Sequence, residues 1–284
     1  MICTRLAGGL GNQLFQLAAA VAMRAEGQSK VYLGTAGLGS YRAQRSFDMA
    51  QLLDLPPWCV GGAAQAGEHK LADRLMTARI GRWLLGSGVS DRNFGVRLAA
   101  GRREPAARWL WLDGYFQQCW GWEEFGPVLS TMLPWVRTAA MEESPPAADC
   151  LIHVRGGDFL GSEVHRVVDV SFYVRALESM RLQRPTLRSA WVVTDDRAYA
   201  GPVLDALARA HPDVDLAFGT HATGGWLGDF ALLRRAPARI LGNSTFSWWA
   251  AALDSHHSLT LSPNQWTRGV PRRLFLPWEA VVPV

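Results

Sequence analysis

Short strand-like runs alternate with helix-like segments along the second half of the chain, and this alternation limits the fold more than any other feature. The runs LIHVR, AWVVT, LAFG and ARIL are short and rich in apolar or β-branched residues. Between them apolar residues recur at helical spacing, as Tyr173, Ala176 and Met180 do after the first run. A helix between two strands returns the chain to the edge from which it started, so the strands pair in parallel. This half therefore predicts an open parallel sheet covered by helices.

The first half of the chain opens with the same strand–helix–strand pattern. A short strand at the N-terminus leads through the turn GGLGN into a helix, and a second strand follows at residues 31–34. Residues 56–108 give no clear order of elements, whereas ESPPAAD at residues 143–149 has the composition of a linker. We predict an α/β fold with two Rossmann-like domains, residues 1–146 and 147–284, that face each other across a cleft. Packing of the last residues on the first domain is left open.

The composition is that of a globular protein and argues against several partners. The 284 residues are 49% apolar and 19% charged, which suffices for buried cores. The net charge of +4 comes from scattered arginines without a long basic tract, so it supports an anionic small substrate better than a nucleic acid. The 13 Trp residues suit either a large core or the binding of sugar rings.

The N-terminus, the hydropathy and the cysteines indicate a cytoplasmic protein. The start MICTRLAGG is too short and too polar for a signal peptide. The sequence also contains no run of 18 apolar residues of the kind that spans a membrane. The 4 cysteines lie far apart without a CxxC pair, as expected for reduced thiols rather than for a zinc site or a disulfide framework. Peripheral contact with a membrane, through the substrate, is left open.

The glycine-rich segment GGLGNQ at residues 8–13 invites comparison with dinucleotide-binding turns. It does not match G-x-G-x-x-G, because Leu14 stands where the third glycine is required, and no acidic residue ends the second strand. A dehydrogenase is therefore the weakest hypothesis. Two alternatives stay open: a turn that brings backbone close to a ligand, with Asn12 and Gln13 as its polar tips, or a tight turn that binds nothing.

The motif IHVRGGDF at residues 152–159 is more informative. Alternation places His153 and Arg155 on one face of a strand, at the C-terminal end where open α/β sheets bind ligands. Arg155 suits a bidentate contact with phosphate, and Asp158 follows on a Gly-Gly loop that permits close approach. An internal Arg155–Asp158 ion pair is the alternative. We favour a binding site, because burying Arg and His without partners is costly.

The segment NSTFSWWAAAL at residues 243–253 predicts a helix with a polar start. Its apolar residues form one helical face, and Asn243 or Ser244 stands at the N-cap. The N–H groups and the positive dipole end of a helix attract anions, so the same segment would also hold a phosphate. Self-capping and phosphate binding are both left open by the segment itself.

Two acidic motifs lack the arrangement of a metal site. DVD at residues 213–215 precedes a strand rather than closing one, which indicates a solvated turn. Asp195 and Asp196 close a strand but have no third ligand, so we interpret them as the N-cap of the following helix. No metal site is predicted.

Taken together, the motifs resemble those of the α-1,2-fucosyltransferase family of bacteria and animals, over essentially the full chain. They are GGLGNQLFQ, GYFQ at 114–117, HVRGGDF at 153–159, VVTDD at 192–196, DFALLRRAPARILGNSTFSWWAAAL at 229–253, SPNQW at 262–266 and PW at 277–278. The resemblance implies a glycosyltransferase B fold. It also implies an inverting, metal-independent transfer of L-fucose from GDP-fucose to the 2-OH of a galactose residue.

The resemblance further implies roles for individual residues. Arg155 and the start of the NSTFSWW helix would hold the donor diphosphate. For the general base of the reaction we favour Asp158 ahead of His153, and a strongly dissociative transition state that needs no base is the alternative. The residues expected to act in catalysis are Asp158, His153 and Arg155. Those expected to contact the donor are Gly9, Asn12, Arg155, Asp229, Asn243, Ser244, Thr245 and Phe246. No metal or other cofactor is expected.

The expected partners are GDP-fucose and a galactose-containing acceptor, either an oligosaccharide or a lipid-linked glycan of polysaccharide or O-antigen biosynthesis. The N-terminal half is expected to bind the acceptor, with Tyr115, Trp120 and Trp122 as sugar platforms or as core residues. One departure stands out, since Gly156 occupies the position of a second arginine in the family. The alternatives are another GDP-sugar glycosyltransferase and a non-catalytic relative that binds GDP or a glycan.

Overall fold

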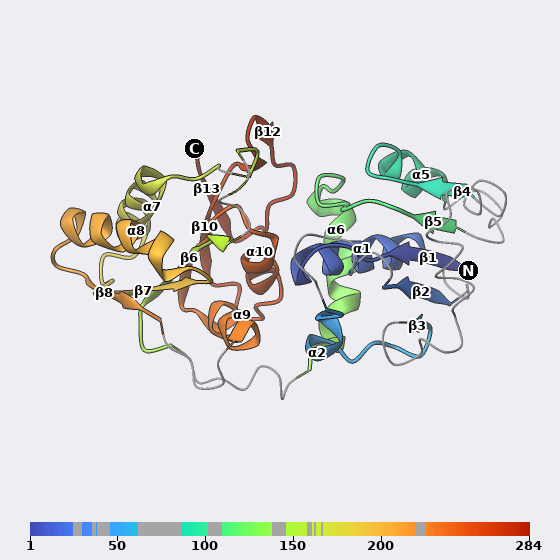
Figure 1. Cartoon of the computed structure of the whole chain (residues 1–284), viewed down its shortest axis with the longest axis horizontal. Helices are drawn as coiled ribbons and strands as arrows, with labels where there is room; N and C mark the ends of the chain where they lie inside the picture. Colours follow the sequence, from blue (N-terminus) through green and yellow to red (C-terminus); the bar gives the residue numbers. More distant parts are fainter. Residues whose placement is uncertain are drawn as a thin grey trace. The chain divides into compact units, whose positions relative to one another are not determined.

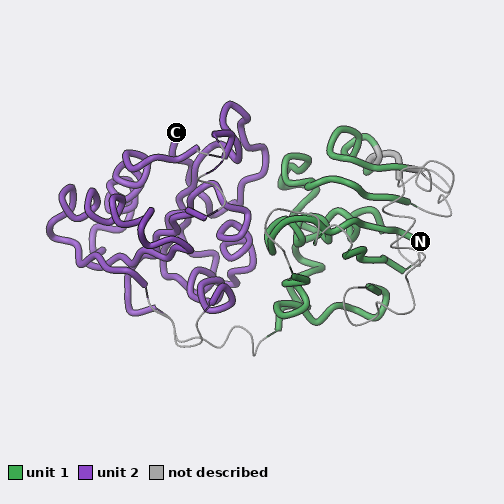
Figure 2. Tube along the Cα trace, in the orientation of Figure 1, with its two compact units in different colours: residues 1–137 green, residues 138–284 purple. Residues whose placement is uncertain are grey.

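The chain folds into two compact units, Met1–Arg137 and Thr138–Val284 (Figure 2). The structure is a computed structural model, and it describes residues 1–24, 30–35, 38, 46–61, 87–101, 110–137, 146–157, 161, 163–165, 167–219 and 225–284. The division falls before the boundary that we placed after residue 146. Residues 143–145 of the expected linker, and Asp158 of the expected site, lie outside the described residues.

The N-terminal unit is built on a parallel sheet with the strand order β3-β2-β1-β5-β4 (Figure 1). Helix α1 buries Leu14, Leu17 and Ala18, as their spacing predicts, but it is buried on its other faces as well, since residues 13–20 are all buried. The described strands are β1 (Ile2–Arg5), β2 (Val31–Gly34), β3 (Cys59–Gly61), β4 (Ser87–Val89) and β5 (Leu110–Leu112). The described helices are α1 (Leu10–Met23), α2 (Met49–Leu52), α5 (Phe94–Gly101), α6 (Trp122–Met132) and the 3₁₀ helix η3 (Leu133–Trp135).

The C-terminal unit contains a second parallel sheet with the order β13-β10-β9-β6-β7-β8 (Figure 1). Its strands are β6 (Cys150–Val154), β7 (Ser189–Thr194), β8 (Asp215–Phe218), β9 (Ala238–Ile240), β10 (Leu259–Pro263) and β13 (Glu279–Val282), beside the hairpin of β11 (Gln265–Thr267) and β12 (Val270–Pro271). The described helices are α7 (Val170–Gln183), α8 (Arg197–Ala210), α9 (Gly225–Arg235) and α10 (Thr245–Ala252). The predicted α/β class with parallel sheets is confirmed, and the last residues form the edge strand β13.

Strand β6 lies in the middle of the C-terminal sheet and is buried at all five positions. Helices cover both faces of a parallel sheet, so its central strands are apolar without alternation. Helix α10 differs from our expectation of a single apolar face, because residues 247–253 are all buried. A helix that is apolar all round belongs in the interior, so α10 is a core helix whose polar start reaches the sheet edge.

Both sheets have a topological switch point beside their first strand. In the C-terminal sheet the chain proceeds from β6 outward to β7 and β8, and then returns to β9 on the other side of β6. In the N-terminal sheet β1 lies likewise between β2 and β5. Ligands of open α/β sheets bind outside the carboxyl ends of the strands at such points. The loops 155–157 and 241–244, and in the other unit 6–9 and 113–117, therefore occupy the expected positions of binding loops.

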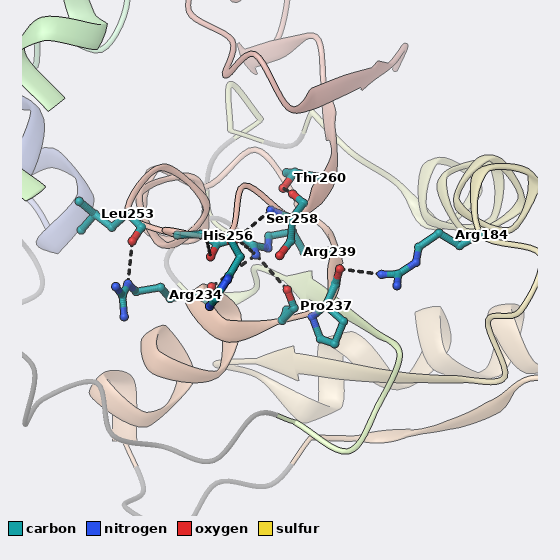
Figure 3. A network of polar contacts seen from close by, with 10 residues as sticks. Arg184, Arg234, Pro237, Arg239, Leu253, His256, Ser258 and Thr260 are labelled. Atoms are coloured by element: carbon teal, nitrogen blue, oxygen red, sulfur yellow. Dashed lines mark hydrogen bonds and ion pairs between the residues drawn. The ribbon is translucent and has the colours of Figure 1, made fainter. Parts of the chain in front are cut away.

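Two buried ion pairs hold helix α10 in the C-terminal unit. After the C-terminal end of the helix, the Nη2 of Arg239, fully buried on β9, donates to the Oδ2 of Asp254 at 2.7 Å (Figure 3). The backbone N–H groups of His256 and Ser258 also donate to this carboxylate. In the middle of the helix, the Nε1 of Trp248 donates to Glu279, whose carboxylate pairs with the buried Arg272 at 2.7 Å. The position of α10 is thus fixed along its length.

Replacement of Asp254 by Asn is expected to lower the free energy of unfolding by about 3 kcal/mol, because the Arg239 charge stays buried without its counter-ion. Chemical denaturation of the full chain measures this loss. The matched control is Asp213→Asn, which breaks the exposed pair of Asp213 with Arg181 and is expected to cost much less. Equal losses in both variants would contradict an essential role for the buried pair.

Candidate active site

His153 is the point at which the chain segments of the C-terminal switch point meet. Its backbone carbonyl accepts hydrogen bonds from the Gly242 N–H at 3.2 Å and from the Tyr173 hydroxyl at 3.3 Å. A Cβ atom on Gly242 would lie 2.9 Å from that hydroxyl, so glycine permits the close approach. The imidazole ring packs against the Phe246 ring, with 5.9 Å between centroids. The end of β6 is thereby joined to the loop after β9 and to the first turn of α10.

The environment of His153 keeps its imidazole neutral. Burial and, secondarily, the positive charge of Arg155 lower the pKa of His153 from 6.5 to about 3. Its Nδ1 atom is buried and has no hydrogen-bond partner among the described residues. A group with so low a pKa is a weak proton acceptor. This favours His153 as a neutral hydrogen-bonding group over the role of general base.

Arg155, one residue past β6, forms an ion pair with Asp195. The alternative pairing that we considered from the sequence, with Asp158, involves a residue outside the described part of the chain. The Oδ1 of Asp195 also accepts a hydrogen bond from the Gly156 N–H at 2.9 Å. Asp195 therefore holds both the side chain and the backbone of the loop after β6.

Asp196 has the capping role that we predicted, whereas its neighbour Asp195 does not. The Oδ1 of Asp196 accepts a hydrogen bond from the Tyr199 N–H at 3.0 Å at the start of α8. A Cβ atom on Gly156 would lie only 2.7 Å from the Cβ of Asp196. The replacement of the family's second arginine by Gly156 thus coincides with tight packing, and an arginine here would require Asp196 to move.

The polar residues before α10 have different roles: Asn243 makes structural hydrogen bonds, whereas Ser244 belongs to the candidate anion site. The Nδ2 of Asn243 donates to the carbonyls of His165 at 2.9 Å and of Trp266 at 3.0 Å. Both amide protons are used in these bonds, so the Asn243 side chain would contact a sugar nucleotide only through its carbonyl oxygen. Ser244 is the N-cap of α10 and its side chain makes no capping hydrogen bond. Of the two alternatives, self-capping by Ser244 is not observed, and Thr245 follows as the first residue of the helix.

The remaining expected donor residues of this unit lie on α9 and α10. Asp229 is half-buried on α9. The next residue, Phe230, is buried and packs against Phe246 with 5.3 Å between ring centroids. Phe246 consequently contacts both Phe230 and His153. The structure joins His153 to the start of α10 through Gly242 and Phe246, and it pairs Arg155, two residues further along, with Asp195.

The glycine turn of the N-terminal unit carries the expected Gly9 and Asn12. Gly8 has φ +78°, and Gly9 is the N-cap of α1 without a side-chain capping bond. Gln13 is not the polar tip that we expected, because it is fully buried and its Nε2 donates to the carbonyls of Gly8 at 3.1 Å and Ser46 at 2.9 Å. Asn12 is half-buried. The buried Gln13 side chain therefore holds the turn in place through its hydrogen bond to Gly8.

At the switch point of the N-terminal unit, Asp91 organises the GYFQ loop, a role the sequence motifs did not reveal. Its carboxylate accepts from the backbone N–H groups of Tyr115, at 3.2 Å, and Phe116. Phe116 has φ +59°, a strained conformation for a bulky residue. Trp120 is 1% exposed and packs against Phe94 and Phe125, which supports the core alternative for this residue. No local signal links Asp91 to the loop, because the two are distant in sequence.

The described residues contain no group of three or more His, Cys, Asp or Glu side chains placed to hold a metal ion. Nor does any helix in this part of the chain have the length and apolar character needed to cross a membrane.

Lowering the pH is expected to destabilise the protein through His153. The unfolded chain binds a proton on this residue below about pH 6.5, whereas the folded chain does so only near pH 3, so stability falls as the pH drops between these values. The variant His153→Phe keeps a ring against Phe246 and cannot titrate. Its free energy of unfolding, measured by denaturant titration from pH 8 to 4, should fall less steeply than that of the wild type. Parallel curves would contradict a neutral buried imidazole.

Gly156→Ala is expected to lower the free energy of unfolding by about 1–3 kcal/mol, because its Cβ atom overlaps the Cβ of Asp196. Gly201→Ala in α8 is the matched control, since no atom outside the local helix lies within 4 Å of its added Cβ. This second variant should gain about 0.5–1 kcal/mol. Thermal unfolding of both variants provides the measurement, and shifts of the same sign would contradict the packing argument.

Comparisons with known proteins found a matching family model and a full-length relative. Residues 135–270 match the family model of glycosyl transferase family 11. An α-1,2-colitosyltransferase of Escherichia coli is 21% identical over 277 residues, which cover 94% of this chain and 92% of that protein. The matched family region contains the end of β6, the Asp195–Asp196 pair and the start of α10.

Two solved fucosyltransferase structures are similar to this chain, and the first of them supports the fold. A crystal structure of NodZ α-1,6-fucosyltransferase soaked with GDP-fucose is 16% identical and has a TM-score of 0.50, covering 90% of this chain and 96% of that chain. A crystal structure of fucosyltransferase NodZ from Bradyrhizobium is 15% identical, with a TM-score of 0.48 and coverage of 88% and 91%. The first likeness confirms the expected glycosyltransferase B fold. The family model and the colitosyltransferase support the resemblance of the motifs to the α-1,2-fucosyltransferase family.

Proposed function

We propose that this protein transfers L-fucose from GDP-fucose, with inversion, to the 2-OH of a galactose residue in a glycan acceptor. The observation that carries the proposal is that Arg155 follows β6 while the loop after the neighbouring strand β9 leads into α10, at the switch point of the sheet. A cation and the positive end of a helix dipole thus follow adjacent strands, at the edge where open α/β sheets bind ligands. A sugar nucleotide is the ligand that this combination and the family relationship favour.

Cleavage of the bond between fucose and phosphate leaves negative charge on GDP. Arg155 and the backbone N–H groups at the start of α10 would stabilise this charge, since both are held in place before the reaction. The hydroxyls of Ser244 and Thr245 add neutral donors for phosphate oxygens. Our proposal includes no metal ion, because Arg155 and the start of α10 would supply the positive charge that stabilises the leaving GDP. Asp229 and Phe246 would contact the donor beside them.

Inversion requires attack by the acceptor hydroxyl from the face opposite the leaving GDP. Asp158, which follows the loop after β6, is our proposed general base, since the low pKa of His153 makes that residue a weak one. Near-normal turnover of Asp158→Asn, at unchanged affinity for GDP-fucose, would contradict this role. We propose that the N-terminal unit binds the acceptor, a galactose-containing oligosaccharide or lipid-linked glycan. Gly9 and Asn12 would contact the donor.

A different donor sugar is the second candidate, and the relative supports it. The E. coli protein is named as an α-1,2-colitosyltransferase, so the donor sugar varies among relatives of this chain. A family member that binds GDP without transfer is the non-catalytic alternative. A screen of GDP-sugars against galactose-terminated acceptors distinguishes these three hypotheses.

The direct test is acceptor-dependent release of GDP from GDP-fucose in the presence of EDTA, with analysis of the product linkage. We expect release that survives EDTA and a product with fucose on the galactose 2-OH. Arg155→Ala should lower kcat/KM about 100-fold, the loss typical of a preorganised group that stabilises charge in the transition state. Arg181→Ala, which removes an arginine paired with Asp213 elsewhere in the unit, should leave activity near that of the wild type.

Three results would count against the proposal. Release with another GDP-sugar only would identify the second candidate, and GDP binding without any transfer would identify a binding protein. Full activity of Arg155→Ala would show that the diphosphate lies elsewhere.

A further inference from the structure

We infer that Asp195 is a positioning residue for donor binding: it holds Arg155 and the loop after β6 in the arrangement that receives the diphosphate. The inference rests on the proposed function of Arg155. Asp195 directly follows β7, the neighbour of β6 in the sheet. Since parallel strands end at the same edge, Asp195 lies beside the loop that Arg155 begins.

The two carboxylate oxygens of Asp195 have different partners. Oδ1 accepts the hydrogen bond from the Gly156 N–H at 2.9 Å, and Oδ2 pairs with the Nη1 of Arg155. One side chain thus fixes a backbone group and a cation that are adjacent in sequence. The bond to Arg155 engages a terminal nitrogen of a guanidinium that carries five N–H donors, so its geometry is compatible with a further contact to phosphate.

The glycines of the loop show that it is built closely around this carboxylate. Gly157 has φ +50°, and a Cβ atom on it would lie 2.7 Å from the Oδ2 of Asp195. A Cβ atom on Gly156 would lie 2.7 Å from the Cβ of Asp196, the residue that follows Asp195. Neither position accommodates a side chain without a shift. The loop therefore depends on Asp195 for its path and not merely for a surface contact.

A carboxylate near an anionic ligand has two opposite consequences. By charge alone it opposes binding of a diphosphate, and it would act as a counter-ion that the donor displaces from Arg155. By geometry it limits the motion of a long side chain before the ligand arrives, which lowers the entropy cost of binding. The pair is partly exposed, with side-chain exposures of 21% for Arg155 and 33% for Asp195, so the repulsion is screened. Because the Gly156 N–H anchors the carboxylate, we expect the positioning effect to dominate.

The test is the affinity for GDP, measured by calorimetry on the full chain. Asp195→Asn keeps an oxygen that accepts from the Gly156 N–H and removes the charge that holds Arg155. We expect GDP to bind roughly fivefold more weakly, the effect of losing one partly exposed ion pair. In the Arg155→Ala background the same substitution should have no further effect, because Asp195 acts through Arg155. Asp213→Asn, which breaks the separate pair with Arg181, is the matched control and should leave GDP affinity unchanged.

Each other outcome overturns the inference. Unchanged or tighter binding by Asp195→Asn would identify Asp195 as neutral or as a competing counter-ion. An equal loss in the Arg155→Ala background would show a general structural role. If Asp195→Asn does not fold, Asp195→Ser provides the same comparison, since its hydroxyl is also able to accept from the loop. Failure of the wild type to bind GDP would overturn the proposed function itself, and this result is distinct from the others.

Discussion

The candidate site depends on the parallel pairing of β6 with β9. Leu151 pairs with Arg239 and Ile152 with Ile240, and the Gly242 N–H extends this contact to the carbonyl of His153. Because both strands run in the same direction, their carboxyl ends place the loop of Arg155 beside the loop that leads into α10. Two segments far apart in the sequence thereby lie at one edge of the sheet, where we propose that the diphosphate binds. A shift of this register would change the position of Arg155 relative to the helix start.

The polar start of α10 could stabilise a diphosphate only if the helix is held in place. The contacts of the rest of the helix hold it. A hydrogen bond from Trp248 to Glu279 holds it at its middle, and the buried ion pair of Asp254 with Arg239 holds it just beyond its C-terminal end. Asn243 ties the preceding loop to two backbone carbonyls. Preorganised N–H groups stabilise a developing charge without a reorganisation cost at the moment of reaction. The tryptophans after the polar residues therefore contribute by fixing the position of the helix start.

The sequence predicted the elements of the C-terminal unit well because its strands and helices have clear apolar periods. It also placed Arg155 and Ser244 after strand-like runs, and the structure has them after β6 and after the loop that follows β9. The contacts that complete the site were not predictable in this way. Asp195 and Asp91 act on loops distant in sequence, and an aspartate at the end of a strand has the same local signal whether it caps a helix or pairs with an arginine. Gln13 was misplaced because a polar residue beside glycines is expected at a surface, whereas here its buried side chain donates to two backbone carbonyls.

A crystal structure of the protein with GDP would locate the diphosphate. We predict phosphate oxygens within hydrogen-bonding distance of the Arg155 guanidinium and of the backbone N–H groups at the start of α10. We also expect the Arg155–Asp195 pair to be retained in the complex. A diphosphate bound elsewhere in the C-terminal unit, or one that contacts neither Arg155 nor α10, would contradict the proposed site.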